Sequence, residues 1–298
     1  MILISLMGEQ PIPNLMPLWQ FPEFTTTQFA ATSSTAPRAE ALANAIHRDP
    51  QLQQVKIAPT LTLEAYHIGK SRLKLARAIA DWQAQGETVC LNFTGGTKIM
   101  SGAALLAAGG TGAQLMYVSS EEDCVIFYQS DGVEIRRVPL QVSISVQQYL
   151  EACGLEVEKP NPNSALVPPK EGDPLEIRVL RAAQKSGLFD DVQRGVKVRR
   201  ILPDGKTVKN ELDIVVTRNG KLAICSCKSG KNVSNNDLYE LSAISARENL
   251  GIYCGKVLVA SDPDIPPGVI ERARVDRILL VDHRNLAQVD FYLKQATD

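Results

Sequence analysis

The first half of the chain alternates short apolar runs with longer stretches in which apolar residues recur every three or four positions. A short apolar run predicts a buried β-strand, and the longer pattern predicts an amphipathic helix. Strands are expected over residues 2–7, 25–32, 88–93 and 114–118, and helices over residues 36–48, 70–85 and 97–108. This alternation predicts an α/β fold with a mostly parallel sheet and helices on both of its faces.

A second set of elements follows a proline-rich stretch. Five of the 17 prolines fall within residues 138–170, which predicts a linker between a domain of residues 1–137 and a domain of residues 171–298. Asp173 and Pro174 are typical of the N-cap and first position of a helix. In the second domain we expect helices over residues 174–186, 237–249 and 267–275, and strands over residues 192–202, 211–217, 222–227, 256–260 and 277–281.

Residues 210–230 predict a β-hairpin, because Asn219-Gly220 is a strong two-residue turn signal between two apolar arms. Side chains alternate between the two faces of a strand. In the first arm, one face is expected to carry Leu212, Ile214 and Val216, and the other face Glu211 and Asp213. In the second arm, one face is expected to carry Ala223, Cys225 and Cys227, and the other face Ile224, Ser226 and Lys228.

Asp213 and Lys228 are the candidate catalytic pair of this hairpin. The Asp213 carboxylate is a hard oxygen ligand of the kind that Mg²⁺ or Mn²⁺ prefers. Such a metal lowers the pKa of a bound water, and the Lys228 ammonium can orient that water or neutralise charge that develops on a phosphate. With both side chains on one concave side, the pair indicates phosphodiester hydrolysis.

Glu176 is a third candidate, on the helix predicted over residues 174–186. At about 100° per residue it falls within the apolar arc of that helix, between Ala183 and Leu180. A lone carboxylate on a core-facing stripe is costly unless it is paired or bound to a cation. The helix therefore predicts either a metal ligand or a buried salt bridge, for which Lys228 is a candidate partner.

Glu176 on a helix, Asp213 on a strand and Lys228 on the next strand resemble the core of PD-(D/E)XK nucleases. In that family the helix Glu and the strand Asp help to bind the metal. The sequence departs from the motif at Ser226, where the family has Asp or Glu, and a serine hydroxyl is a weak metal ligand. Glu211 is the candidate replacement, so the expected metal ligands are Asp213, Glu176 and Glu211. The alternative is a site that binds nucleic acid and cuts poorly.

Two loops of the first domain have the composition of anion-binding loops. Residues 8–14 follow the first strand, where ligands bind in open α/β sheets. Thr94-Gly95-Gly96-Thr97-Lys98 precedes a helix, and its small residues let backbone N–H groups approach an anion. A Gly-Gly pair before a helix also serves as a simple tight turn. The first domain has neither a Walker A loop nor a Gly-x-Gly-x-x-Gly loop, which argues against ATP hydrolysis and NAD binding.

The charge distribution and the cysteine and histidine content limit which classes of function fit the sequence. Residues 174–231 contain 13 Lys and Arg against 6 Asp and Glu, although the chain carries a net charge of −1. This local excess is typical of a surface for phosphate backbones or of a solvated face.

The six scattered cysteines and three histidines predict reduced thiols rather than disulfides or a zinc site. The apolar residues 1–7 are too few to span a membrane, and we expect a cytoplasmic protein with no membrane partner.

Both loops and the nuclease-like core resemble, in the same domain order, the CARF–nuclease effectors of type III CRISPR systems, where CARF denotes a CRISPR-associated Rossmann fold. The resemblance implies a homodimer that binds a cyclic oligoadenylate, with cyclic tetra-adenylate as the expected ring, across two Rossmann-like domains. It implies that this allosteric activator switches on the nuclease. The implied ligand-binding residues are Gly8, Glu9, Gln10, Pro11, Thr94, Gly95, Gly96, Thr97 and Lys98, with residues 32–35 as further candidates.

Two functions therefore compete. The first is a metal-dependent endonuclease of antiviral defence that cyclic oligoadenylate activates and that cuts DNA, RNA or both. The second is a cyclic-oligoadenylate-sensing regulator that binds nucleic acid through a degenerate, weakly active or inactive nuclease domain, which Ser226 favours. A nucleotide-binding metabolic enzyme is a more distant third.

Overall fold

The computed structural model describes residues 1–158, 174–201, 205–230 and 233–298. The chain divides into two compact units, Met1–Val142 and Ser143–Asp298, which are described separately below. Residues 159–170 of the predicted linker and the predicted N-cap Asp173 lie outside the described residues. The rest of the predicted linker belongs to the two units: residues 138–142 to the first, and residues 143–158 to the second, where Val146, Tyr149 and Leu150 bury their side chains.

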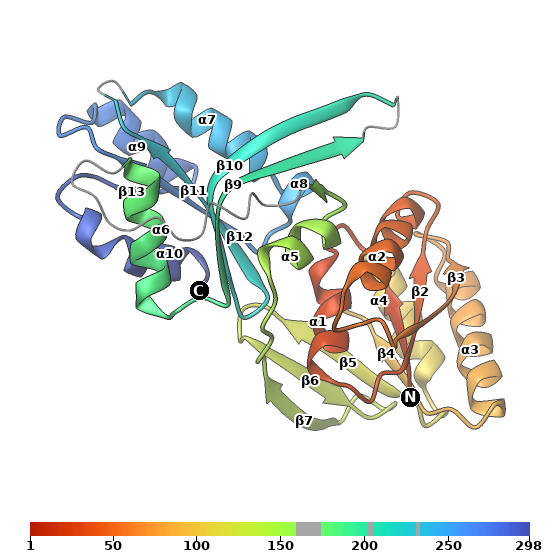
Figure 1. Ribbon diagram of the computed structural model, residues 1–298. Helices are drawn as coiled ribbons and strands as arrows, with labels where there is room; N and C mark the ends of the chain where they lie inside the picture. Colours follow the sequence, from red (N-terminus) through yellow and green to blue (C-terminus); the bar gives the residue numbers. More distant parts are fainter. Residues whose placement is uncertain (159–173, 202–204, 231–232) are drawn as a thin grey trace. The chain divides into compact units, whose positions relative to one another are not determined.

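The first unit is built on a seven-stranded sheet (Figure 1). Its strands are β1 (Ile2–Leu6), β2 (Thr26–Ala31), β3 (Lys56–Thr62), β4 (Val89–Asn92), β5 (Gln114–Ser119), β6 (Cys124–Tyr128) and β7 (Glu134–Pro139). They lie in the order β3-β2-β1-β4-β5-β6-β7, with β1 to β5 parallel and β6 antiparallel to both of its neighbours. The strand order reverses between β1 and β4, and open α/β sheets bind ligands at the carboxyl ends of strands at such a point.

The helices of this unit are α1 (Ile12–Gln20), α2 (Ala36–Arg48), α3 (Ile68–Ala84) and α4 (Lys98–Ala108). The predicted mostly parallel sheet is confirmed, but the loop predicted as far as residue 14 is wrong at its end. Helix α1 already begins at Ile12, because Pro11 and Pro13 fit the first turn of a helix, where backbone N–H groups have no intrahelical acceptor. Strand β3 was not expected, because most of its side chains are exposed and it has no apolar run.

The second unit contains a six-stranded mixed sheet. Its strands are β8 (Glu156–Val157), β9 (Asp191–Ile201), β10 (Thr207–Arg218), β11 (Lys221–Lys228), β12 (Cys254–Ala260) and β13 (Leu279–Val281), in the order β13-β12-β11-β10-β9-β8. Strands β11 to β13 are parallel, and β8 to β11 are antiparallel. The predicted hairpin turn is confirmed: Arg218 pairs with Lys221, and Asn219 and Gly220 have φ of 49° and 76°, as a type I′ turn requires.

Helices pack against this second sheet. They are α5 (Val146–Ala152), α6 (Leu175–Ser186), α7 (Asn235–Ile244), α8 (Arg247–Leu250), α9 (Pro267–Val275) and α10 (Val289–Ala296), with a 3₁₀ turn, η2 (Leu286–Gln288). Helices α6 and α10 lie beside each other against this sheet (Figure 1). They share one hydrophobic core with Ile214, Cys225 and Val257 of the sheet. Helix α10 was not predicted, although Val289 and Leu293 recur at helical spacing and are buried. Within the described ranges, no helix combines the length and the apolar character needed to cross a bilayer.

Tyr149 gives a direct test of this core. Its side chain is fully buried, and its hydroxyl donates to the carbonyl oxygen of Leu250 at 2.9 Å, which ties α5 to the end of α8. Tyr149→Phe leaves that carbonyl without the bond, so the free energy of unfolding should fall by about 1 kcal/mol or slightly more. Urea unfolding measures the change, with Tyr66→Phe as a control at a side chain that is 86% exposed. An equal effect of both substitutions would contradict the assigned bond.

Candidate functional sites

Strands β10 and β11 are joined by a turn, and farther along they diverge (Figure 1). Their pairing runs from Arg218–Lys221 to Ile214–Cys225 and stops there. Beyond that point β10 stays beside β9, whereas β11 stays beside β12 as far as Lys228. The sheet therefore forks at Asp213, and the candidate catalytic residues lie on the two branches of the fork.

The Asp213 carboxylate lies within the fork. Its Oδ2 accepts the N–H of Cys227 at 2.8 Å and the hydroxyl of Ser226 at 3.2 Å. Because β10 has left β11 here, the carboxylate replaces the strand partner that the Cys227 N–H would otherwise have. The structure thus brings Asp213 and Ser226 together, and Asp213 helps to hold the branches of the fork in place.

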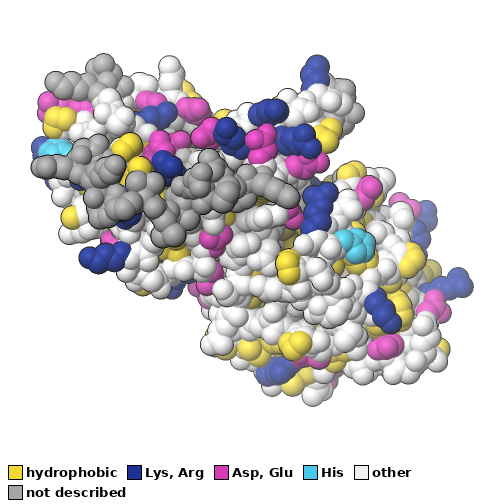
Figure 2. Space-filling model, in the orientation of Figure 1, with side chains coloured by type: hydrophobic (Ala, Val, Ile, Leu, Met, Phe, Trp, Pro, Cys, Tyr) yellow, Lys and Arg dark blue, Asp and Glu magenta, His cyan; other side chains and the backbone are white. Residues whose placement is uncertain are grey.

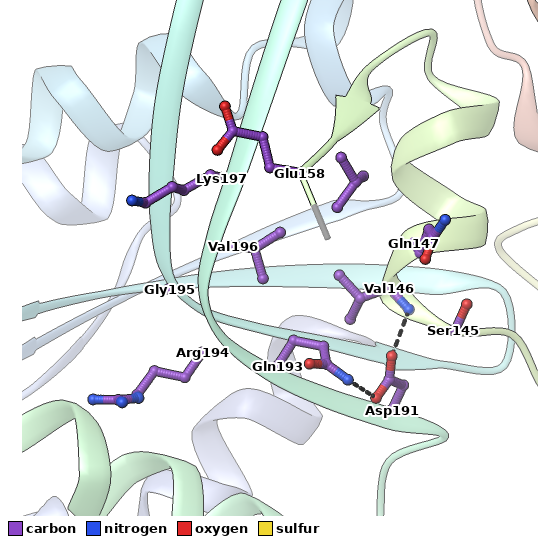
Figure 3. A pocket seen from close by; sticks show the side chains of 11 residues that line it. Ser145, Val146, Gln147, Glu158, Asp191, Gln193, Arg194, Gly195, Val196 and Lys197 are labelled. Carbon is purple, nitrogen blue, oxygen red and sulfur yellow. Dashed lines mark hydrogen bonds between the residues drawn. The ribbon is translucent and has the colours of Figure 1, made fainter. Parts of the chain in front are cut away.

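The expected strand alternation is wrong in one respect. Ile214 packs in the core against α6, whereas Leu212 lines a cavity together with Ile244 and Leu250, so Leu212 and Ile214 do not share a face. Gly195 lies across from Asp213 between the paired residues of β9 and β10, and its φ of 62° bends β9 (Figure 3). A positive φ inside a strand bends that strand locally, and glycine adopts it at little cost.

Lys228 pairs with α7. Its Nζ lies 3.1 Å from Asp237 Oδ1 and 3.4 Å from Glu240 Oε2. Burial lowers the pKa of the Lys228 ammonium, but hydrogen bonds and charge from Asp237 and Glu240 outweigh burial and hold this pKa above its ordinary value. The ion pairs of Lys228 with described residues therefore involve α7, and the salt bridge to Glu176 considered from the sequence is not formed.

Sequence reasoning missed both partners of Lys228. The Asp237 carboxylate also accepts the N–H of Ser234 at 2.8 Å, in a capping box that starts α7. Ser-x-x-Asp before an apolar run is a signal that could have placed Asp237 in the first turn of α7. The pairing of that carboxylate with Lys228 depends on the packing of α7 beside β11, which no local pattern predicts.

Glu176 lies in the first turn of α6 with its side chain 39% exposed, so it is at the edge of the core rather than inside it. Its Oε2 is 3.9 Å from Arg194 on the bend of β9, a partner that the sequence did not suggest. Burial raises the pKa of Glu176, the charges of Asp213 and Glu211 raise it further, and Arg194 opposes them. Three carboxylates therefore act on one another near the fork.

This set of side chains fits a hard divalent cation in its donor chemistry. Asp213, Glu176 and Glu211 carry oxygen donors of the kind such a cation prefers. Burial, together with the charges of Asp213 and Glu211, raises the pKa of Glu176, and a bound positive charge would relieve this repulsion. In the part of the chain that the structure describes, no three His, Cys, Asp or Glu side chains lie close enough together to hold a metal ion. Metal binding by these residues therefore remains a proposal.

The two predicted loops of the first unit touch each other at the carboxyl ends of β1 and β4. A Cβ atom added at Gly8 would lie 2.8 Å from the backbone nitrogen of Gly96, and one added at Gly95 would overlap the carbonyl oxygen of Leu6. Only glycines allow this approach of the two backbones. The small residues of both loops therefore build one continuous surface at the point where the strand order reverses.

Some loop residues are already engaged. The Thr94 hydroxyl donates to Asn92 Oδ1 at 2.6 Å, and the Thr97 hydroxyl donates to the Ala65 carbonyl at 2.7 Å while it caps α4. These hydroxyls hold the loop in place, and ligand binding by Thr94 and Thr97 stays a prediction. Glu9 and Lys98 are exposed.

The remaining candidate residues of the loop site differ in burial and in hydrogen bonding. Gln10 is half-buried and Pro11 is buried as the N-cap of α1. Thr32 and Thr35 hydrogen-bond to each other in the turn before α2, and these bonds give residues 32–35 a structural role in that turn. Sequence reasoning missed Arg38, whose guanidinium donates to the Glu9 carbonyl and places a cation beside the first loop.

Solved structures with the same fold cover nearly the whole chain. The crystal structure of protein VC1899 from Vibrio cholerae has a TM-score of 0.81 at 15% identity and covers 99% of this chain and 97% of its own. Can2 from Sulfobacillus thermosulfidooxidans, in complex with cyclic tetra-adenylate, has a TM-score of 0.79 at 16% identity and covers 98% and 96%. A type III CRISPR defence DNA nuclease activated by cyclic oligoadenylate has a TM-score of 0.62 at 19% identity; it covers 89% of this chain and 47% of that longer chain.

A search of curated protein sequences found no match. Family models, in contrast, match both parts of the chain. The Card1 CARF domain matches residues 2–149, and the Card1-like endonuclease domain matches residues 169–297. Between them they span nearly all of the sequence, and the chain therefore belongs to the Card1-like family, with an N-terminal CARF domain and a C-terminal endonuclease domain.

Proposed function

We propose that this chain is a metal-dependent endonuclease of CRISPR antiviral defence that cyclic oligoadenylate activates. The observation that carries the proposal is the junction of the Gly8 and Gly95 loops at the switch point of a CARF domain. The same chain carries a Card1-like endonuclease domain whose sheet forks at Asp213. One domain thus supplies a surface for an anionic ligand, and the other supplies carboxylates and a lysine for phosphodiester chemistry.

The activator is proposed to bind across the touching loops of the CARF domain. Backbone N–H groups near Gly95 and Gly96 and the N-terminus of α4 favour an anion, and Lys98 adds an exposed cation. Can2, which shares the fold, has been solved with cyclic tetra-adenylate. A ring with two-fold symmetry meets the same loops twice on the axis of a homodimer. Light scattering with and without the ring should therefore give the mass of two chains.

The endonuclease domain is proposed to act through residues at the fork. Asp213 and Glu176 would hold Mg²⁺ or Mn²⁺, with Glu211 as the third carboxylate in place of the one that Ser226 lacks. When bound, the metal lowers the pKa of a coordinated water and stabilises negative charge on the phosphate. Ser226 orients Asp213 through its hydroxyl, and the charged Lys228 stabilises negative charge that develops on the phosphate.

Activation has a thermodynamic requirement. The cyclic ligand must bind the cutting-competent arrangement more tightly than the resting one, because equal affinity shifts no population. Linkage makes the coupling reciprocal. If the bound ring raises the affinity for nucleic acid by some factor, bound nucleic acid should raise the affinity for the ring by the same factor. Calorimetric titration of the ring with and without a non-cleavable DNA measures this factor, and a factor of one would contradict gating through a shared equilibrium.

A cleavage panel tests the proposed activity and identifies the substrate. The panel comprises supercoiled plasmid, single-stranded DNA and RNA with Mn²⁺, each with and without cyclic tri-, tetra- or hexa-adenylate. We expect cutting of at least one substrate that depends on one ring size. Intact substrates under every condition would rule out the endonuclease function.

A second function remains in competition because of Ser226. If the serine at this position, in place of a carboxylate, leaves the site inactive, the protein is a cyclic-oligoadenylate-sensing regulator that binds nucleic acid without efficient hydrolysis. The contact between the Ser226 hydroxyl and Asp213 Oδ2 favours an active endonuclease, since it gives the serine a defined place at the fork.

Ser226→Glu distinguishes the two functions. We expect no gain in the cutting rate, because a new carboxylate would lie beside Asp213, whose charge, together with burial, already raises the pKa of Glu176. Initial rates on the best substrate of the panel measure the effect. Gln184→Glu adds the same charge at an exposed position of α6 and serves as the control. A gain of about tenfold or more, equal to roughly 1.4 kcal/mol in the barrier, would instead support a degenerate site.

A further inference from the structure

The hairpin of β9 and β10 extends beyond the fork as a ribbon arm, defined here as residues 196–201 and 205–212, with the two-residue strand β8 paired along β9 at Val198 and Arg199. One face of the arm carries side chains that lie directly opposite one another in the strand register, and all of them are exposed: Lys197, Arg199 and Ile201 of β9, and Thr207, Lys209 and Glu211 of β10. Figure 2 shows several Lys and Arg side chains along this arm, with Asp and Glu side chains between them. We call this surface the basic face.

The other face anchors the arm to its own unit. Val198 and Leu212 are buried and line a cavity of about 250 Å³ together with Ile244 and Leu250. Arg200, on the same face, donates to Asn249 at 2.7 Å. The arm is therefore held from one side, which leaves the basic face open to a partner.

The basic face carries an electrostatic cost that the fold does not require. Lys209 lies directly opposite Arg199, and like charges at such positions destabilise a strand pair. Arg199 pairs with Glu156 and Lys197 lies directly opposite Glu211 in the register, but in the described ranges neither Lys197 nor Lys209 forms an ion pair. A stripe of cations retained at this cost is suited to the phosphates of a nucleic acid.

The basic face leads to the candidate cutting site. Lys209 precedes Asp213 by four residues on β10, roughly 13 Å along an extended strand. That length equals about four base-pair steps of a duplex. Phosphates held by the arm would therefore lie within a few nucleotides of a phosphodiester bond at the fork.

The form of the arm favours one kind of nucleic acid. Beyond β8 the arm is two-stranded, with Arg200 and Ile201 of β9 paired to Val208 and Thr207 of β10. The major groove of B-form DNA admits such a β-ribbon, whereas the major groove of an RNA duplex is too deep and narrow for side chains to read. Single strands are held largely by stacking on aromatic rings, and residues 191–218 include no Phe, Tyr or Trp. The arm therefore lacks a platform for unpaired bases.

From these observations we infer that the ribbon arm docks on duplex DNA and that Lys197, Arg199 and Lys209 contact its phosphates. The inference rests on the proposed nuclease function for its purpose, because the arm would position DNA for cutting at the fork. Binding itself requires neither an active site nor an activator.

The test compares Lys197→Gln/Lys209→Gln with Lys185→Gln/Arg284→Gln, which removes the same charge at exposed positions of the same unit. Fluorescence anisotropy with a labelled 30-base-pair DNA duplex is measured on the full chain in EDTA, over a series of salt concentrations, with and without cyclic tetra-adenylate. Single-stranded DNA and duplex RNA of the same length are run in parallel. Thermal unfolding checks the fold, and neutralising Lys209 should not lower the melting temperature because it relieves repulsion with Arg199.

Loss of two phosphate contacts should weaken duplex DNA binding on the order of tenfold near 0.1 M salt. The logarithm of the association constant should also fall less steeply with the logarithm of the salt concentration, with a slope about two smaller in magnitude. The control variant should bind as the unmodified chain does. An equal loss in the control, an equal loss for single-stranded DNA or duplex RNA, or no duplex binding by the unmodified chain would overturn the inference. Because cutting is not measured, an arm that binds DNA beside an inactive fork is distinguished from an arm that does not bind.

Discussion

Asp213→Asn is expected to reduce activator-dependent cutting at least about a hundredfold while the protein stays folded. The amide oxygen of Asn can still accept the N–H of Cys227 and the hydroxyl of Ser226, which are the two bonds that Asp213 makes at the fork. The substitution removes the negative charge that a divalent cation needs and that positions the attacking water. Removing one such electrostatic group from an active site costs about a hundredfold or more in rate.

Initial rates of plasmid cleavage and thermal unfolding measure the two parts of this prediction. Asp191→Asn is a matched control, because Asp191 also accepts a backbone N–H, that of Val146 at 2.9 Å, but does so away from the fork. If Asp213→Asn cuts at the rate of the unmodified chain, the residues assigned to the site are wrong, although the endonuclease class survives. Loss of the fold would instead show that the charge of Asp213 is needed for structure.

Gly95→Ala is expected to weaken binding of the cyclic ligand by about 10- to 100-fold. Its Cβ would overlap the Leu6 carbonyl oxygen, so the second loop must move away from the first. Overpacking of this kind costs about 1–3 kcal/mol, and about 1.4 kcal/mol corresponds to a factor of ten in affinity. The loops should then no longer present one continuous surface to the activator, and cutting should need a higher ligand concentration.

Calorimetric titration with cyclic tetra-adenylate measures the change in affinity. Gly102→Ala is the control: Gly102 lies in α4 of the same unit, and its added Cβ would make only an ordinary contact of 3.6 Å with Ile68. Alanine in a helix interior should stabilise that control by about 0.5–1 kcal/mol. Equal affinities of the Gly95 variant and the unmodified chain would remove the touching loops from the binding site.

Local signals accounted for much of the fold. Asn219-Gly220 located the hairpin because only a few residue types accept positive φ at both turn positions. The parallel order of β1 and β4 followed from alternating strands and helices, and it brought the Gly8 and Gly95 loops together. Helix α1 was missed because its first turn contains prolines, which are usually read as loop signals, and α10 was missed although its apolar spacing was present in the sequence.

The candidate site could be predicted only in part. Strand periodicity placed Asp213 and Ser226 on neighbouring strands, and they do hydrogen-bond. It could not show that β9 bends at Gly195, or that Leu212 and Ile214 across from this bend pack in different places, because a positive φ inside a strand leaves no periodic signal. The partners of Lys228 and Glu176 come from α7 and from β9, so they depend on tertiary packing.

The most direct test of the central claim is the ratio of plasmid cleavage rates with and without cyclic tetra-adenylate, measured on the full chain with Mn²⁺. A cutting site controlled by the CARF domain predicts a ratio of at least about a hundred, which corresponds to a coupling of roughly 2.7 kcal/mol and lies within the usual range for allosteric proteins. Rapid cutting at equal rates in both conditions would contradict activation, and an intact plasmid in both would contradict cutting of this substrate and favour a protein that senses its ligand without hydrolysing DNA.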